Sequence, residues 1–396
     1  MEAKRIQQLF AVFVLLGTSS MGCQPAAHSD PDPTAQFQKE IDALRQEYGF
    51  PGATAAYVLS DGTAGVVATG FSDIESVSKM STSSRMLAAS IGKTFVSATV
   101  LNLAQERRLG VDDRISVWLG DEPWFARLPN HDSITVRQLL THSAGIPNHV
   151  DDPAFAAALA ENWAKPGELF SPEMLIGYVL DQPALFAPGD GWSYSDTGYV
   201  LVGLIIEKMT GRSYYEEVQE RFLDPLDLSL TSPSDRHDLP GLAAGYMSAD
   251  NMFGLPAKTT GDDGRMVWNP ATEWTGGGLA SNSLDIARWA KALFEGRAME
   301  GPYLDDLLSA IPISAELLDV SYGAGVGIHE NGPIGPWYSH GGWIPGYSSS
   351  LRYYPEHRVA IAFQINTDIG IVDDSTDLYE EMGARLELVV VPGAAE

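Results

Sequence analysis

The fold of this chain is decided by the stretch MLAASIGKTFV at residues 86–96. Apolar residues continue beyond it at helical spacing, so the stretch predicts the opening of a helix. Ser90 would then lie in the first turn, where free backbone N–H groups and the positive end of the helix dipole favour developing negative charge. Lys93 projects from the same face one turn later, and an amine beside a serine hydroxyl can lower its pKa or carry its proton away. The pair predicts a nucleophile with its activator.

A serine three residues before a lysine also arises by chance, so the spacing alone is weak evidence. The chain contains a second such pair, Ser76 and Lys79, which leads into the polar run MSTSS at residues 80–84. That run has no apolar period and is typical of a loop. Only Ser90 opens a helix behind an apolar lead-in, and this context makes it the candidate.

Composition limits the function classes. The chain has 396 residues, of which 44% are hydrophobic and 19% charged, as in an ordinary globular protein with a sizeable core. The formal net charge of −27 argues against a nucleic-acid partner and against electrostatic docking on anionic lipid.

The N-terminus predicts export. Residues 1–23 combine Lys4 and Arg5 with a short apolar run at residues 9–16 and the only cysteine, Cys23. This pattern resembles a bacterial lipoprotein signal, in which the cysteine is lipidated and tethers the protein to a membrane, although Ser20 stands where an aliphatic residue is usual. The alternative is a plain secretory signal cut near residues 26–27. Either signal predicts a periplasmic or outer-surface protein.

Residues 24–34 carry three prolines and are expected to form a tether. Because Cys23 is the only cysteine, no internal disulfide is expected.

The remaining chain predicts an α+β fold. Its two ends carry the strand patterns and its middle carries mainly helices, so an antiparallel sheet built from both ends with a helical insertion is expected. The predicted sheet domain comprises residues 35–110 and 270–396, the helical domain comprises residues 111–269, and the active site lies between them. The expected strands are 53–59, 65–70, 323–328, 346–354 and 359–365, and the expected helices include 37–48, 134–140, 199–210, 283–294 and 378–386.

A second motif is PGDGWSYSDTGY at residues 188–199, a loop just before a helix. Tyr194 stands where it can face a cleft. An adjacent ammonium favours the phenolate, which would make Tyr194 a base. The alternative is a packing tyrosine in an aromatic-rich loop.

A third motif is SHGGWIPGYSS at residues 339–349. Its glycines would let a strand approach a substrate closely. The N–H group of Trp343, which follows Gly342, could join the N–H group of Ser90 as an oxyanion hole. The alternative is a glycine-rich hairpin with His340 on the surface.

In combination and in this order, the three motifs resemble those of the serine β-lactamase and penicillin-recognising superfamily. They are most similar to the branch of class C β-lactamases, D-alanyl-D-alanine carboxypeptidases and related esterases. The likeness runs from about residue 50 to residue 368 and includes three supporting stretches: LLTHSAG at 139–145, GGGLAS at 276–281 and PGYS at 345–348.

The resemblance implies a β-lactamase/transpeptidase-like fold and a two-step acyl transfer without metal or cofactor. Ser90 attacks a carbonyl, Lys93 and Tyr194 share the proton traffic, and the backbone amides of Ser90 and Trp343 hold the oxyanion. Water then hydrolyses the acyl-enzyme. The implied substrate is a small molecule or peptide: a small ester, a D-amino-acid peptide or a β-lactam.

Two positions depart from the family pattern. Asp196 replaces an asparagine, and an ionised carboxylate only accepts hydrogen bonds. It would also favour the charged form of Lys93 and leave more of the base's task to Tyr194. Together with His340 in place of a lysine, Asp196 makes the site less welcoming to a substrate carboxylate, which favours neutral esters or amides.

Two other protein classes are alternatives to the β-lactamase superfamily. An α/β-hydrolase is disfavoured because the chain contains no Gly-x-Ser-x-Gly elbow. A non-catalytic descendant that binds cell-wall peptide or a partner remains open because of Asp196. Three aromatic residues, Trp192, Trp343 and Tyr347, are expected to line the cleft, and His142 is expected to stabilise its loop without a chemical role.

Overall fold

The computed structural model describes residues 33–162, 170–248, 251, 254–315, 317, 319–370 and 376–393. The expected signal segment with Cys23 and most of the expected tether lie outside the described residues. Pro33 and Thr34, which the sequence placed in the tether, belong instead to helix α2 (Pro33–Tyr48). A proline fits the first turn of a helix, because the N–H group it lacks would have no intrahelical partner there.

The central feature is a nine-stranded sheet in the order β3-β2-β1-β12-β11-β10-β9-β8-β7, and neighbouring strands in it are antiparallel. Strand β1 pairs with β2 on one side and with β12 on the other, so both ends of the described chain build the middle of the sheet, as expected. The strands are β1 (Gly52–Val58), β2 (Ala64–Asp73), β3 (Ser78–Lys79), β7 (Ile311–Pro312), β8 (Val320–Tyr322), β9 (Gly327–Gly332), β10 (Gly335–Ile344), β11 (Tyr347–Tyr354) and β12 (Val359–Ile365).

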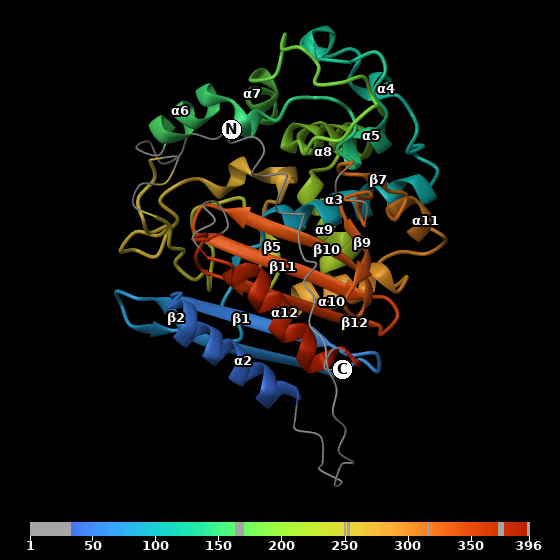
Figure 1. The fold of residues 1–396 in the computed structure, drawn as a ribbon. Coiled ribbons are helices and arrows are strands. Elements are labelled where there is room, and N and C mark those ends of the chain that lie inside the picture. Colours follow the sequence, from blue (N-terminus) through green and yellow to red (C-terminus); the bar gives the residue numbers. More distant parts are fainter. Residues whose placement is uncertain are drawn as a thin grey trace.

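The outer face of the sheet is covered by α2 and α12 (Leu378–Val390), and α10 (Ser283–Phe294) packs on the inner face (Figure 1). Strands β1 and β12 are buried along their whole length, because helices cover both faces. Phe37, Ile41 and Leu44 of α2 pack on the outer face at the helical spacing that the sequence showed.

The segment between the two parts of the sheet is mainly helical and lies above the sheet in Figure 1. A small second sheet, β4-β6-β5, joins Met86–Leu87, Leu279–Ser281 and Ser232–Pro233. The helices of this part and of the remaining connections are α3 (Gly92–Gln105), α4 (Ser116–Leu119), α5 (Val136–Leu140), α6 (Pro153–Asn162), α7 (Pro172–Gly177), α8 (Asp196–Thr210), α9 (Tyr214–Val218) and α11 (Leu304–Leu307). No helix within the described ranges is both long and apolar enough to cross a bilayer.

The sequence misjudged several boundaries. The helix that follows Ser90, which Gly110 was expected to end, stops at Gln105, and β9 begins at Gly327 rather than at residue 323. Strand β10 was not among the expected strand ranges, although the glycines of the motif at residues 339–349 had suggested a strand close to the substrate; it forms an antiparallel hairpin with β11.

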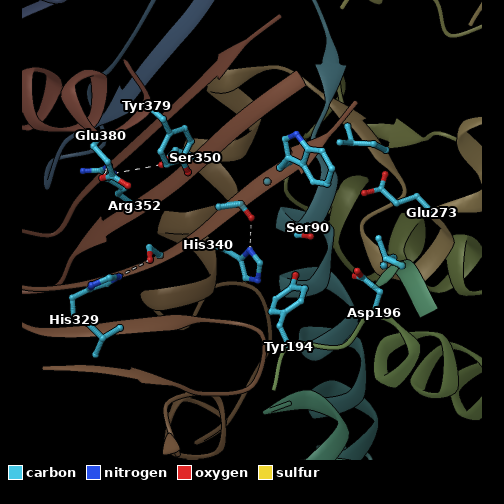
Figure 2. Close-up of a pocket in the computed structure, with 18 of the residues that line it drawn as sticks. Ser90, Tyr194, Asp196, Glu273, His329, His340, Ser350, Arg352, Tyr379 and Glu380 are labelled. Atoms are coloured by element: carbon cyan, nitrogen blue, oxygen red, sulfur yellow. Dashed lines mark hydrogen bonds and ion pairs between the residues drawn. The ribbon is translucent and has the colours of Figure 1, made fainter. Parts of the chain in front are cut away.

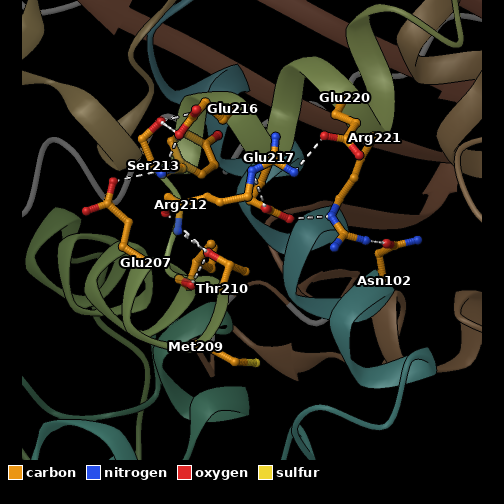
Figure 3. A network of polar contacts seen from close by, with 12 residues as sticks. Asn102, Glu207, Met209, Thr210, Arg212, Ser213, Glu216, Glu217, Glu220 and Arg221 are labelled. Carbon is orange, nitrogen blue, oxygen red and sulfur yellow. Dashed lines mark hydrogen bonds and ion pairs between the residues drawn. The ribbon is translucent and has the colours of Figure 1, made fainter.

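A polar network ties α9 to the end of α3 (Figure 3). Glu217 is only 2% exposed, and its carboxylate accepts a hydrogen bond from Arg221 at 2.7 Å and pairs with Arg212 at 3.5 Å. Arg221 also donates to Asn102 and to Glu106 of the segment that follows. These contacts link elements more than a hundred residues apart.

Replacement of Glu217 by alanine is expected to lower the free energy of unfolding by about 2 kcal/mol, because Arg221, whose side chain is 16% exposed, loses one of its two carboxylate partners. Chemical denaturation measures the change. Glu220→Ala is the matched control: Glu220 also pairs with Arg212, but its side chain is 68% exposed, so a change below about 0.5 kcal/mol is expected. Equal effects of the two substitutions would contradict the assigned role of Glu217.

Candidate active site

Ser90 lies in a tight turn directly before α3. The turn is a 3₁₀ helix over Ala89–Ile91 that runs into α3 at Gly92, so Ser90 lies two residues before α3 rather than in its first turn. Ala89 has a φ of +49°, a conformation that residues with a side chain rarely adopt. A Cβ atom on Gly277 would lie 2.2 Å from the Ala89 carbonyl oxygen. Glycine at position 277 is therefore required for this loop to pack behind Ser90.

Lys93 is fully buried, and its ammonium faces three acceptors. It donates to Ser90 Oγ at 3.1 Å, to Asp196 Oδ1 at 2.5 Å and to the carbonyl oxygen of Gly276. Burial by itself lowers the pKa of Lys93, but the charge and hydrogen bond of Asp196 outweigh it and raise the pKa above its ordinary value. Lys93 is therefore a cation in the substrate-free protein, as the presence of Asp196 led us to expect. The rival pair Ser76 and Lys79 lies instead at an exposed hairpin.

Tyr194 lies beside Lys93, and its hydroxyl is turned toward Ser90 (Figure 2). Burial raises the pKa of Tyr194 to about 12, while the Lys93 charge and the hydrogen bonds to Lys93 and Ser90 act in the opposite direction. The sequence had suggested a net shift toward the phenolate. The shift is the other way because burial outweighs the single neighbouring cation, so Tyr194 is a neutral phenol before substrate binds.

The loop of residues 142–149 positions the Tyr194 motif. His142 Nδ1 accepts a hydrogen bond from the Ser195 backbone N–H at 3.2 Å, and Asn148 Oδ1 accepts one from the Asp196 N–H at 3.0 Å. Ser195 caps α8 and donates through its hydroxyl to the carbonyl oxygen of Pro147. Because Asp196 is the first residue of α8, its carboxylate also lies at the favourable end of the helix dipole. His142 stabilises these loops, as expected.

Strand β10 brings the third motif against the Ser90 turn. A Cβ atom on Gly342 would lie 2.2 Å from the carbonyl oxygen of Ala88, so only glycine lets the strand approach the turn this closely. This approach places Ser90, Gly342 and Trp343 in the wall of one cavity. The oxyanion role of the Ser90 and Trp343 amides remains a prediction that this arrangement permits.

His340 is not a surface residue. It is 1% exposed, its Nδ1 lies 2.6 Å from the Gly341 carbonyl oxygen and its Nε2 lies 2.8 Å from the Tyr322 hydroxyl. The carbonyl can only accept, so Nδ1 carries the proton and Nε2 accepts from Tyr322. Burial, aided by the Lys93 charge, lowers the pKa of His340 to about 3. The histidine is thus neutral and supplies no positive charge for a substrate carboxylate.

The cavity has a volume of about 800 Å³ and extends from Ser90 past β10 toward α12 (Figure 2). It brings together the predicted site residues Ser90, Tyr194, Asp196, His340, Gly342 and Trp343. Trp343 lines the cavity, whereas the other two aromatic residues expected there belong to hydrophobic clusters and do not line it. Trp192 packs on Tyr322, and Tyr347 is fully buried with its hydroxyl bonded to the Ala243 carbonyl oxygen.

Sequence reasoning missed two residues of the site, Glu273 and Tyr322. Glu273 lines the cavity and stands three residues before the Gly276–Gly278 stretch that had been noted, so its neighbourhood was a usable signal. Tyr322 had none, because only the pairing of distant strands brings it to His340. Within the described ranges, no three His, Cys, Asp or Glu side chains are grouped so that they could hold a metal ion.

The sheet flanked by helices, with a serine–lysine pair packed against β10 and β11, defines the β-lactamase/transpeptidase-like class of α+β proteins. The Beta-lactamase family model matches residues 37–384. The chain therefore belongs to the Beta-lactamase family.

Individual relatives agree with this assignment. The chain is 25% identical over 308 residues to penicillin-binding protein 4* of Bacillus subtilis, which covers 76% of this chain but only 64% of that protein. It is 26% identical over 392 residues to penicillin-binding protein 4 of Amycolatopsis lactamdurans, covering 92% of this chain and 94% of the relative.

Among solved structures, a D-stereospecific amidohydrolase from Streptomyces sp. is 30% identical with a TM-score of 0.74, covering 85% of this chain and 95% of its own. The D-amino acid amidase of Ochrobactrum anthropi SV3 shares the fold at 21% identity, with a TM-score of 0.72 and coverage of 90% and 98%.

Proposed function

We propose that this protein hydrolyses small esters or amides that carry no carboxylate beside the scissile bond. The observation that carries the proposal is the charge around Ser90. Lys93 is already paired with Asp196, His340 is neutral, and Glu273 adds a second carboxyl group to the same wall. A substrate carboxylate placed there would meet like charge without a free cation.

The proposed reaction has two steps. Ser90 Oγ bonds to the substrate carbonyl carbon, and the serine proton passes to Lys93 as Lys93 gives one of its own to Asp196. An asparagine could not accept that proton, whereas a carboxylate can. Tyr194 protonates the leaving group and regains a proton from Lys93, which takes back the proton held by Asp196. A water molecule then attacks the acyl carbon, and its proton passes through Tyr194 to Ser90 Oγ as the acyl–Ser90 bond breaks. The Ser90 and Trp343 amides stabilise the oxyanion in both steps.

The solved structures that share this fold support an amide or ester substrate. Two solved structures with this fold are titled a D-stereospecific amidohydrolase and a D-amino acid amidase. Penicillin-binding proteins are also among the relatives, so a β-lactam or D-alanyl peptide is the second candidate class.

We further propose that the enzyme is exported and tethered to a membrane through lipidated Cys23, which fractionation of the producing cells would check.

The substrate class is tested by comparing a short p-nitrophenyl ester with a penicillin. The wild type is expected to turn over the ester without hydrolysing the penicillin. Asp196→Asn should raise the ratio of penicillin to ester turnover about tenfold, since removing one like charge relieves on the order of 1.4 kcal/mol of repulsion. An unchanged ratio, or rapid penicillin hydrolysis by the wild type, would overturn the proposed preference.

A further inference from the structure

Glu273 is an ionisable side chain that lines the same cavity as Asp196 and that the mechanism does not use. It lies between the short helical turns Pro270–Thr272 and Trp274–Gly276, behind the nucleophile. A Cβ atom on Gly276 would lie 3.5 Å from Asp196 Oδ1 and 3.8 Å from Glu273 Cγ, so the two acidic side chains flank the same glycine. Figure 2 shows the Glu273 carboxyl group turned toward Ser90 and Asp196.

Among the residues that the structure describes, no basic side chain forms an ion pair with the Glu273 carboxyl group. Its Oε2 atom is buried and accepts no hydrogen bond from any residue that the structure describes. Lys93 is the nearby cation, but its ammonium donates to Asp196, Gly276 and Ser90 rather than to Glu273. Burial raises the pKa of Glu273 to about 8; Lys93 opposes this rise and Asp196 adds to it. A buried acceptor without a partner is unfavourable unless a ligand supplies a donor.

We propose that Glu273 binds a cationic amine on the acyl part of the substrate, so that the preferred substrates are amides or esters of amino acids with a free α-amino group. The proposal rests on the function proposed above and adds a specificity-determining residue to it. An ammonium has three donors and a positive charge, and it would meet two acidic side chains at this wall. Its charge favours the ionised form of Glu273, which the empty site disfavours.

The geometry also fixes which end of the substrate is recognised. Glu273 and Asp196 flank Gly276, whose carbonyl oxygen holds Lys93 beside Ser90. An amine bound there lies close to the carbonyl that Ser90 attacks, as an α-amino group does. A carboxylate at the same place would meet the Asp196 charge and would hold Glu273 in its neutral form, so the arrangement favours an amine over a carboxylate.

The test compares two substrates that differ only in the amine: the p-nitroanilides of D-phenylalanine and of 3-phenylpropanoic acid. Each is assayed with the wild type, Glu273→Gln and Asp319→Asn. Asp319 lines the same cavity, but its carboxylate accepts a hydrogen bond from Asn331. Its replacement therefore removes the same formal charge without removing an unpaired acceptor.

Glu273→Gln is expected to lower the ratio of kcat/KM for the amine substrate to that for the amine-free substrate about tenfold, mainly through KM, because a charge-assisted hydrogen bond is lost. Asp319→Asn should keep the wild-type ratio. The inhibition constant of 2-phenylethylamine, measured against the amine-free substrate, should rise in parallel in Glu273→Gln. This constant reports binding of the amine and not its turnover.

Three outcomes would overturn the inference: a wild type that does not prefer the amine substrate, an equal fall for both substrates in Glu273→Gln, or an equal shift of the ratio in Asp319→Asn. Ser90-dependent turnover of the amine-free substrate would still support the proposed hydrolase in each case. Loss of the fold in Glu273→Gln would show in its circular dichroism, and Glu273→Asp, which keeps the charge, should then retain part of the amine preference.

Discussion

Ser90→Ala is expected to lower kcat/KM for a p-nitrophenyl ester by about four orders of magnitude and to abolish covalent labelling. Ser90 Oγ is the hydroxyl to which the buried Lys93 ammonium donates, and alanine removes the only atom that can form the acyl bond. Intact mass after incubation with a serine-directed fluorophosphonate shows the adduct directly. The substitution removes one partly buried oxygen atom and should leave the fold intact.

Ser76→Ala is the matched control, since Ser76 also stands three residues before a lysine but lies on an exposed turn. It should label and turn over substrate like the wild type. Labelling that persists in Ser90→Ala would place the nucleophile elsewhere. A wild type that neither labels nor hydrolyses esters, amides or β-lactams would favour the non-catalytic binding protein that the sequence left open.

Lys93→Met is expected to lower kcat/KM by about three orders of magnitude, the effect of losing a positioned acid–base group. Methionine preserves much of the buried stem but leaves the Asp196 carboxylate without its cation. Negative charge that develops on Ser90 would then face an unpaired carboxylate instead of an ammonium at 3.1 Å. The measurement is pre-steady-state acylation by the same ester.

Stability and chemistry are separated by a second variant. Lys93→Met alone should also destabilise the protein, because it breaks a buried ion pair. Adding Asp196→Asn removes the orphaned charge and should restore much of the stability but not the acylation rate. Recovery of acylation in the double variant would show that Lys93 has only a structural role. Lys79→Met, which changes a surface lysine, is the control for the effect of a lysine-to-methionine change on acylation and stability.

The local pattern predicted much of this protein. The apolar period of residues 37–48 and the alternation around residues 53–70 correspond to α2 and the β1–β2 hairpin. Thr135 and Gln138 form a capping box at the start of the expected helix α5, and Gly211 ends α8 in the left-handed conformation. These features depend on neighbours within a few residues, which a sequence displays directly.

The family and the fold class could also be predicted, because three short motifs in a fixed order identify the residues that lie together in the site. The predictions of an α+β fold and of the β-lactamase superfamily are confirmed by the sheet and by the family match over residues 37–384. The structure brings Ser90, Lys93, Tyr194 and Asp196 together, although their chemical roles remain predictions.

The sequence by itself determined the family, the hairpins and helices, and the identity of the nucleophile's neighbours, since each of these depends on residue type and local spacing. Only the tertiary structure decided the charge states of the site. His340 became neutral and Tyr194 remained a phenol because distant strands and helices exclude water from both. Glu273 joined Asp196 because packing of the Gly276–Gly278 loop behind Ser90 brings together segments far apart in the chain, and burial there raises the pKa of Glu273.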